Sequence, residues 1–356
     1  MKKLLLSFLL LTPSMVHAAE YEHKGIKFEA NTKLNAYYGY SATPDRYRVN
    51  NDYTRFIGNA EVNLSASKEG YSLHLDLMHG FNKLDRNYNN GIWGKEIYGV
   101  IDKDFGRIMI GETFNVADQF HQGPSGVNDI DISEYVVTPN WARGKNSVSY
   151  KTLDSTSIST DGVAPKITYI TPEYKNTYLG FSYINNVNNR RGLSDRNLSY
   201  EGNSGYVSSI YNEYDLGFAE ARTSISYAEF RKDDKEHAAS LSLSKGGWTL
   251  SGGYRKAYID GNMPNDIGDN YREGYAWDIG LGYEIGPFET ELSYFNSKAK
   301  NTSNEDRIIQ LSNNYSINKY AKVYLNIAYA EFIGEDKSVE NNNKGFAFVT
   351  GLGLEF

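Results

Sequence analysis

The feature that most constrains the fold is the last stretch of the sequence, residues 345–356, which reads GFAFVTGLGLEF. Phe346, Phe348 and Leu352 share one set of alternate positions, and small or polar residues take most of the others. This period of two is that of a β-strand with one apolar face. Because an unpaired apolar edge strand promotes aggregation, we expect this strand to pair with the first strand and close a barrel, with Phe356 as its closing aromatic residue.

The same alternation recurs along the whole chain. In residues 26–40, Phe28, Leu34 and Tyr38 fall on one face, and Lys33 falls on the other with further polar residues. Comparable stretches follow at 56–64, 71–77, 248–254, 275–283, 288–294 and 323–329. Their second faces carry charged side chains, which could not face a dry protein core without a large desolvation cost. The pattern therefore predicts a water-filled interior behind an apolar outer surface.

Short turns and long polar loops alternate between the predicted strands. The short turns lie near residues 68–70, 103–106, 215–217, 245–247, 286–287 and 318–319. The long loops lie near residues 82–94, 185–203, 231–235, 258–272, 298–305 and 332–344. Short periplasmic turns on one side and long extracellular loops on the other are typical of outer-membrane barrels. We therefore predict an all-β fold, a transmembrane antiparallel β-barrel of about 16 strands, with about 14 or 18 as the neighbouring even numbers.

Residues 144–184 are the hardest part of this barrel to assign. Residues 144–152 and 166–174 both have the pattern of a strand, and the segment between them has no clear role. Elsewhere no linker or change of composition divides the chain. We therefore expect one barrel domain, residues 20–356.

Composition narrows the possible functions. The chain has no cysteine, which excludes disulfides, thiol nucleophiles and thiolate metal sites. No apolar run approaches the roughly 18 to 20 residues of a membrane-spanning helix, and the mean hydropathy is negative. Barrels are compatible with this hydropathy because only alternate residues face lipid. The net charge of −7 argues against a nucleic-acid-binding surface.

The N-terminus has the features of a secretory signal. Lys2 and Lys3 precede the apolar run LLLSFLLL, and the small residues Ala18 and Ala19 follow it. We therefore expect residues 1–19 to be a signal peptide that is removed as the chain is exported through the periplasm. The predicted destination is the outer membrane of a Gram-negative cell.

Three segments resemble the Gram-negative general porins, which are trimeric barrels of 16 strands that pass small hydrophilic solutes. They are ITYITPEYKNTYLGFSY at 167–183, DFGRIMIGE at 104–112 and GLGLEF at 351–356. The resemblance implies a homotrimer in the lipid bilayer, with one loop of each barrel folded into its lumen. It implies no cofactor.

In the family that this chain resembles, acids on the inward loop face a ladder of basic residues across the pore. The corresponding loop here runs from Thr113 to Thr138, and its acidic residues are Asp118, Asp129, Asp131 and Glu134. Basic residues at the expected wall positions are Lys33, Arg55 and Arg143. Each of these side chains could instead be a solvated lumen charge without a special role.

One position of the predicted basic ladder differs from the family pattern. The glycine-arginine pair of the family is replaced here by Gly111-Glu112. An anion in place of a cation is expected to shift the preference of the pore toward cations, although Arg107 could compensate. The predicted function is therefore passive diffusion of small hydrophilic solutes and ions, with a weak preference for cations.

Other functions are weighed against this one. A substrate-selective channel for sugars or other nutrients is an alternative because tyrosine is abundant, and a surface-binding or adhesive barrel is another. The histidines have no metal-ligand spacing, so we expect no metal site. His74 beside Asp76 is the only pairing that suggests a hydrolase, and lumen decoration explains it better. We predict no enzymatic activity.

Overall fold

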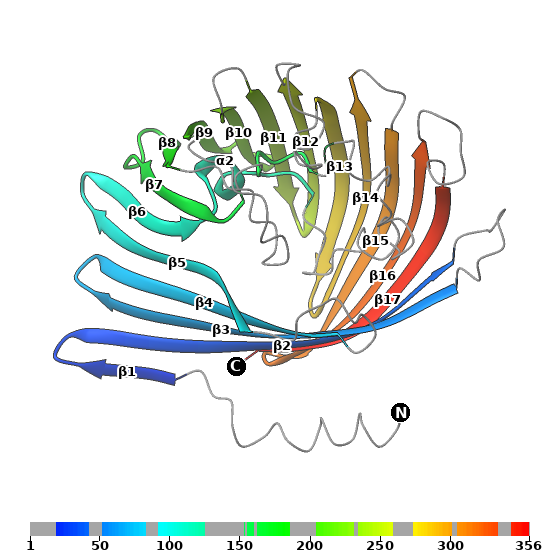
Figure 1. Ribbon diagram of the computed structural model, residues 1–356, viewed down its shortest axis with the longest axis horizontal. Coiled ribbons are helices and arrows are strands. Elements are labelled where there is room, and N and C mark those ends of the chain that lie inside the picture. The colour runs from blue at the N-terminus through cyan, green and yellow to red at the C-terminus, as the bar shows by residue number, and fades with distance from the viewer. Residues whose placement is uncertain are drawn as a thin grey trace.

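The chain forms a closed barrel of sixteen antiparallel strands, β2 to β17, in a computed structural model (Figure 1). The structure describes residues 19–42, 52–82, 92–124, 153, 155–159, 162–185, 204–230, 234–258, 273–300, 305–333 and 343–355. No helix in these ranges is long and apolar enough to cross a membrane.

The first half of the wall follows chain order. Its strands are β2 (Ile26–Ala42), β3 (Asp52–Lys68), β4 (Tyr71–Asn82), β5 (Ile92–Lys103), β6 (Gly106–Thr113), β7 (Ala164–Ile170), β8 (Thr177–Ile184) and β9 (Gly205–Asp215). The second half continues with β10 (Glu220–Glu229), β11 (Lys235–Lys245), β12 (Trp248–Tyr258), β13 (Gly274–Ile285), β14 (Phe288–Ala299), β15 (Glu305–Asn318), β16 (Ala321–Ile333) and β17 (Asn343–Glu355). Each strand pairs with its neighbours in sequence, so the predicted all-β barrel and its strand number are confirmed.

The barrel closes where β17 pairs with β2, from Phe346 opposite Ala42 to Glu355 opposite Lys33. The predicted partner of the last strand is therefore confirmed, whereas Phe356 lies outside the described residues. A short strand that the alternation alone does not predict, β1 (Ala19–His23), pairs with β2 below this point (Figure 1). It covers the part of the β2 edge that β17 leaves uncovered.

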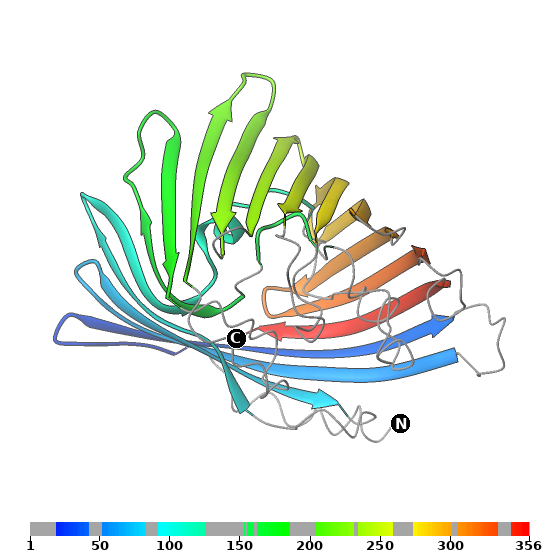
Figure 2. The same ribbon diagram turned by 45° about the horizontal axis from the view of Figure 1, so that its top comes forward.

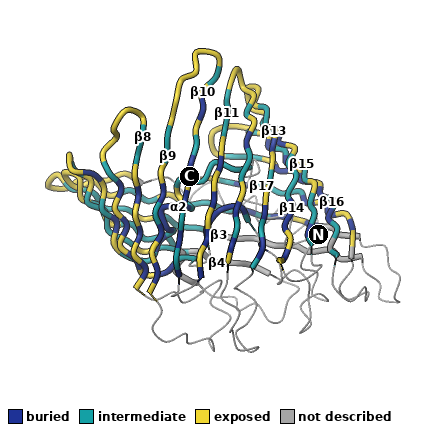
Figure 3. The backbone as a smooth tube through the Cα atoms, turned by 90° about the horizontal axis from the view of Figure 1, so that it is seen from above, coloured by how far each residue is buried: buried dark blue, intermediate teal, exposed yellow. Residues whose placement is uncertain are grey.

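The two faces of each strand meet different surroundings, as the alternating bands of Figure 3 show. On β17, Phe346 is 60% exposed on the outside, whereas Ala347 and Val349 are buried on the inside. On β14, Leu292 is 53% exposed on the outside, with Leu281 and Leu311 as its cross-strand neighbours. The predicted outward row of apolar side chains is therefore confirmed.

Aromatic side chains gather at both ends of the outward apolar band. At the end with the short turns, Trp248 contacts Tyr283 with ring centroids 4.3 Å apart. At the end with the long loops, Tyr329 contacts Phe346 at 4.8 Å. Rings at these two levels are the usual girdles of a barrel at the two membrane interfaces.

The short turns require specific backbone conformations. In the β3–β4 turn, Glu69 and Gly70 have φ values of 50° and 81°. This pair of positive values is typical of a two-residue hairpin that matches the twist of its strands. A Cβ atom at Gly70 would lie 2.3 Å from the carbonyl oxygen of Asp102, so the next hairpin packs directly against this glycine.

The structure assigns part of the ambiguous region 144–184. β6 pairs directly with β7, with Thr113 opposite Ala164, and β7 and β8 account for the 167–183 segment. The predicted strand at 144–152 lies outside the described residues. The segment that leaves the wall at Thr113 therefore returns to it at Ala164, later than the predicted loop end at Thr138.

Candidate pore constriction

The segment that follows β6 turns into the barrel. Figures 1 and 2 show its one-turn helix, α2 (Val116–Gln119), inside the ring of strands beside β8 and β9. Asn115 begins this helix, because its side-chain oxygen accepts hydrogen bonds from the backbone N–H groups of Ala117 and Asp118 at 2.8 and 3.1 Å. Its amide nitrogen donates to the carbonyl oxygen of Ile158 at 2.8 Å, which ties the outgoing and returning parts of the loop together.

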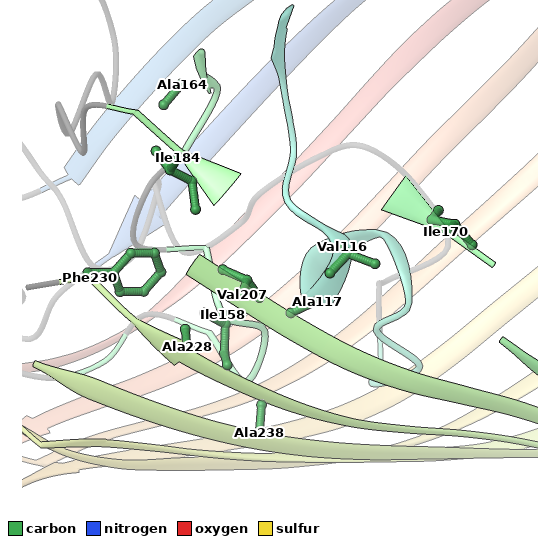
Figure 4. Close-up of a cluster of buried hydrophobic side chains, with 10 residues drawn as sticks. All are labelled: Val116, Ala117, Ile158, Ala164, Ile170, Ile184, Val207, Ala228, Phe230 and Ala238. Carbon is green, nitrogen blue, oxygen red and sulfur yellow. The ribbon is translucent and has the colours of Figure 1, made fainter. Parts of the chain in front are cut away.

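Apolar side chains fix this loop to one side of the lumen. In Figure 4, Val116 and Ala117 of α2 and Ile158 of the returning segment belong to one cluster with wall residues. Val116 and Ile158 are fully buried. The wall residues of the cluster are Ala164, Ile170, Ile184, Val207, Ala228, Phe230 and Ala238. The loop therefore lies on a dry patch of β7 to β11 rather than hanging free in the pore.

Hydrogen bonds to wall hydroxyl and carboxyl groups extend this attachment toward β13. The backbone N–H of Val116 donates to Ser182 Oγ at 3.0 Å, and that of Gln122 donates to Ser240 Oγ at 2.8 Å. Farther round the wall, the Thr156 hydroxyl donates to Asp278 Oδ2 at 2.5 Å. The loop is thus bonded to strands from β8 to β13.

A buried lysine holds the two ends of the loop. The ammonium group of Lys166 donates to the carbonyl oxygen of Gly162 at 2.9 Å and also to that of Thr113. These two carbonyls belong to the points where the loop leaves the wall and where it comes back. The Lys166 ammonium group therefore has a structural role, because it joins the two ends of the loop.

A buried ion pair lies under the returning segment. Arg255 Nε is 2.7 Å from Glu236 Oε2, with side-chain exposures of 4% and 7%, and Arg255 Nη1 lies 3.3 Å from Ser155 Oγ. His121 is 3.1 Å from Thr156 Oγ1. Burial and the nearby Arg255 guanidinium lower the pKa of His121 to about 4, so this ring is neutral at pH 7.

The opposite wall leaves an open space beside the loop. A cavity of about 760 Å³ extends along β2 to β6, and Phe114 and Gln119 of the loop close its other side. The ring of His74 stacks on that of Tyr98, with centroids 4.9 Å apart, and the imidazole Nε2 lies 2.8 Å from Ser72 Oγ. The His74 ring therefore contacts Ser72 and Tyr98, and these contacts do not form the His74–Asp76 pair that a hydrolase would use.

The predicted basic wall is only partly brought together. Lys33 lies on the inward row of β2, directly between Glu61 of β3 and Glu355 of β17 in the strand register. Arg107 lies on the inward row of β6 at its short-turn end, where its guanidinium contacts Asp102 at 2.7 Å. Arg55 takes the β3 position opposite Gly39, and its side chain is outside the described set. Arg143 falls outside the described residues.

The predicted acidic side of the constriction differs from expectation at Glu112. Its register partners are Ile97 and Pro165, which are exposed on the outer face, so Glu112 belongs to the outward row of β6. The glycine before it, Gly111, takes the inward position, because successive residues of a strand point to opposite faces. The prediction that Glu112 acts as a lumen charge is therefore wrong.

Asp118 is the one predicted loop acid within the described residues. It lies inside the barrel, where Ser157 Oγ donates to its Oδ1 at 2.5 Å. That contact joins the two halves of the loop. Asp129, Asp131 and Glu134 belong to the part of the chain that the structure does not describe.

Acids that the sequence analysis did not assign to the constriction face one another across adjacent strands. Glu284 of β13 is directly opposite Glu289 of β14, and Asp76 of β4 is directly opposite Glu96 of β5. All four occupy inward rows. Their alternation predicts the inward side, but the cross-strand pairing depends on the register, which a single strand pattern does not contain. Within the described ranges, no group of three or more histidine and acidic residues could hold a metal ion.

Comparison with known proteins agrees with this architecture. The model of the Gram-negative porin family matches residues 6–334. No curated protein matches the chain.

Solved structures with the same fold include three outer-membrane channels. The channel DcaP of Acinetobacter baumannii has a TM-score of 0.63 at 12% identity and covers 95% of this chain and 100% of its own. OmpF of Salmonella typhi has a TM-score of 0.62 at 13% identity, with 95% and 100% covered. An anion-selective porin from Comamonas acidovorans has a TM-score of 0.60 at 15% identity, with 93% and 100% covered.

Family and fold point to a channel rather than to an enzyme. The barrel has paired aromatic rings at both ends of an apolar outer face and a loop folded inside, and the family model covers nearly all of it. The chain therefore belongs to the Gram-negative porin family and forms a channel in the outer membrane.

Proposed function

We propose that the channel passes small hydrophilic solutes and ions by passive diffusion and weakly prefers cations. The observation that carries this proposal is the charge distribution of the lumen. Among the described inward residues, Arg107 and Arg222 lie beside carboxylates, whereas the carboxylates of two cross-strand pairs lie beside one another. A narrow passage with an excess of negative charge raises the local concentration of cations.

Two arginines on inward rows of the described strands lie beside carboxylates. Arg107 contacts Asp102 at 2.7 Å, and Arg222 contacts Glu213 at 2.9 Å. Since a contacting carboxylate offsets most of the field of each guanidinium, these arginines contribute little attraction for anions. Of the proposed wall cations, Arg107 is thus paired with a carboxylate, and Lys33 lies between Glu61 and Glu355 in the strand register.

The carboxylate residues Glu284 and Glu289 lie opposite each other on adjacent strands. Glu284 is exposed and Glu289 is half-buried, and the two face each other at the short-turn mouth of the pore. Asn314 Nδ2 donates to Glu289 at 3.1 Å, which orients this carboxylate without neutralising it. We propose that this pair attracts cations at the periplasmic entrance.

We also propose how the barrel assembles and how its N-terminus is processed. We propose that three copies of the barrel associate, as the resemblance to trimeric porins implies, and that residues 20–356 form one domain after residues 1–19 are removed. For the constriction itself, we propose Lys33, Arg55, Arg107 and Arg143 on the wall side, opposed by Asp118, Asp129, Asp131 and Glu134 of the loop.

A second candidate is a channel that binds a sugar or another nutrient as it passes. The stacked His74 and Tyr98 rings favour it, because they present an aromatic surface next to the acids Glu96 and Asp102 in the 760 Å³ cavity. Block of the ion current that saturates with one solute would support this candidate. Equal, unsaturated effects of many solutes would support passive diffusion.

The facing carboxylates Glu284 and Glu289 predict a cation-selective reversal potential. In a planar bilayer with a salt gradient, the wild type is expected to prefer potassium over chloride, and replacing Glu284 and Glu289 together by glutamine is expected to move the reversal potential toward zero. The matched control is the double variant with Asp104→Asn and Glu173→Gln, which removes the same number of charges from exposed positions in the β5–β6 and β7–β8 turns. A wild-type preference for chloride, or an equal shift in the control, would refute the proposal.

A further inference from the structure

We infer that three glycines of the barrel wall, Gly180, Gly253 and Gly280, are the seats that position the inward loop and thereby set the free cross-section of the pore. They lie on β8, β12 and β13. The inference rests on the proposed function in one respect, because it takes the space beside the loop to be the conducting path.

The backbone does not require glycine at these positions. None of the three has a positive φ, unlike the turn glycines Gly70 and Gly247. A glycine inside a strand weakens it, because it adds flexibility and lacks a side chain to pack. Another cause must therefore favour glycine at the three wall sites, and each of them has a loop residue packed against it.

Gly180 receives the loop helix. A Cβ atom built on Gly180 would lie 2.0 Å from Val116 Cγ2 and 3.1 Å from Phe120 Cε2. Val116 is fully buried, and its backbone N–H is bonded to Ser182 on the same strand. Its side chain therefore has no room to move away, and α2 can occupy this place only above a residue without a side chain.

Gly253 and Gly280 receive the rest of the described loop. A Cβ atom at Gly253 would lie 2.5 Å from Thr156 Oγ1, the hydroxyl that is bonded to Asp278. A Cβ atom at Gly280 would lie 2.8 Å from Pro124 Cβ. The outgoing part of the loop thus has its own seat on β13, and the returning part has one on β12.

A nearby glycine without a loop above it provides the contrast. Gly282 lies two residues after Gly280 on the same inward row of β13, and the nearest atoms to a Cβ there would be 3.7 Å away, which is an ordinary contact. A methyl group is therefore tolerated at Gly282. At Gly280 it would push Pro124 and the attached loop away from the wall and into the conducting space.

This difference gives a matched experiment in planar bilayers. Gly280→Ala is expected to lower the unitary conductance and raise the open-channel noise, whereas Gly282→Ala is expected to conduct as the wild type does. Gly253→Ala is expected to act like Gly280→Ala. Equal conductance and noise in Gly280→Ala and Gly282→Ala would overturn the inference, provided that the wild type conducts.

A cross-link tests the position of the loop independently of conductance. The Cβ positions of Val116 and Gly180 are 3.2 Å apart, close to the roughly 3.5–4.5 Å range of disulfides, and the chain has no cysteine of its own. The variant with both Val116→Cys and Gly180→Cys lacks the Val116 Cγ2 atom that excludes a side chain at position 180, so its two cysteines are expected to form an intramolecular disulfide. Failure to cross-link under oxidising conditions would overturn the seat at Gly180. A wild type without conductance would instead refute the proposed function and leave the cross-link result meaningful.

Discussion

Replacing Arg255 by methionine is expected to destabilise the folded barrel by about 3–5 kcal/mol, because the change leaves the buried Glu236 carboxylate without its guanidinium. The two side chains are only 4% and 7% exposed and lie 2.7 Å apart. Arg255 also contacts Ser155 of the inward loop, so the loop loses a wall contact as well. The free energy of unfolding in urea, measured in lipid vesicles, reports this loss.

Two further variants separate the buried charge from other effects of the substitution. The double variant with Arg255→Met and Glu236→Leu removes both charges and is expected to recover most of the lost stability. Arg222→Met breaks an exposed pair, with 47% exposure for both Arg222 and Glu213, and is expected to cost less than about 1 kcal/mol. The interpretation would be contradicted if Arg255→Met cost no more than Arg222→Met.

Replacing Leu292 by arginine is expected to cost about 2–4 kcal/mol, which is the effect of a cation on the lipid face near the middle of the membrane. Leu292 is 53% exposed on the outer face, and its neighbours Leu281 and Leu311 are also apolar. The penalty has a simple cause, since hydrocarbon cannot solvate the guanidinium.

Ser293→Arg is the matched control for this prediction. Ser293 is the next residue of β14 and lies on the inward row, opposite Gly280 and Gln310. There the arginine can reach water, so we expect little change in the free energy of unfolding. Equal penalties at the two positions would show that they do not face different solvents.

Much of the fold follows from short-range pattern. Alternation along 26–40 and 345–356 predicts β2, β17 and their pairing, and turn glycines predict the hairpins. β1 (Ala19–His23) is too short to show a clear alternation. The Lys24-Gly25 pair that follows it is a hairpin signal that could have indicated the strand, and its φ values are 52° and 75°.

The constriction depends on contacts between residues far apart in sequence, which a pattern does not contain. The family comparison of Gly111-Glu112 predicts a lumen acid, yet the register with β5 and β7 turns Glu112 outward. Likewise, Gly180 and Gly280 are ordinary strand residues in the sequence. Their importance arises only from the docking of Val116 and Pro124 upon them.

Adjacent residues of each described strand are expected to face hydrocarbon on one side of the barrel wall and water on the other. Single cysteines at Leu241 and Leu292 on the outward rows, and at Ser242 and Ser293 on the inward rows, test it directly in this cysteine-free chain. With the barrel in lipid vesicles, a small charged thiol reagent is expected to label the two inward positions quickly and the two outward positions hardly at all. Labelling at equal rates, or preferential labelling of the outward pair, would contradict the account.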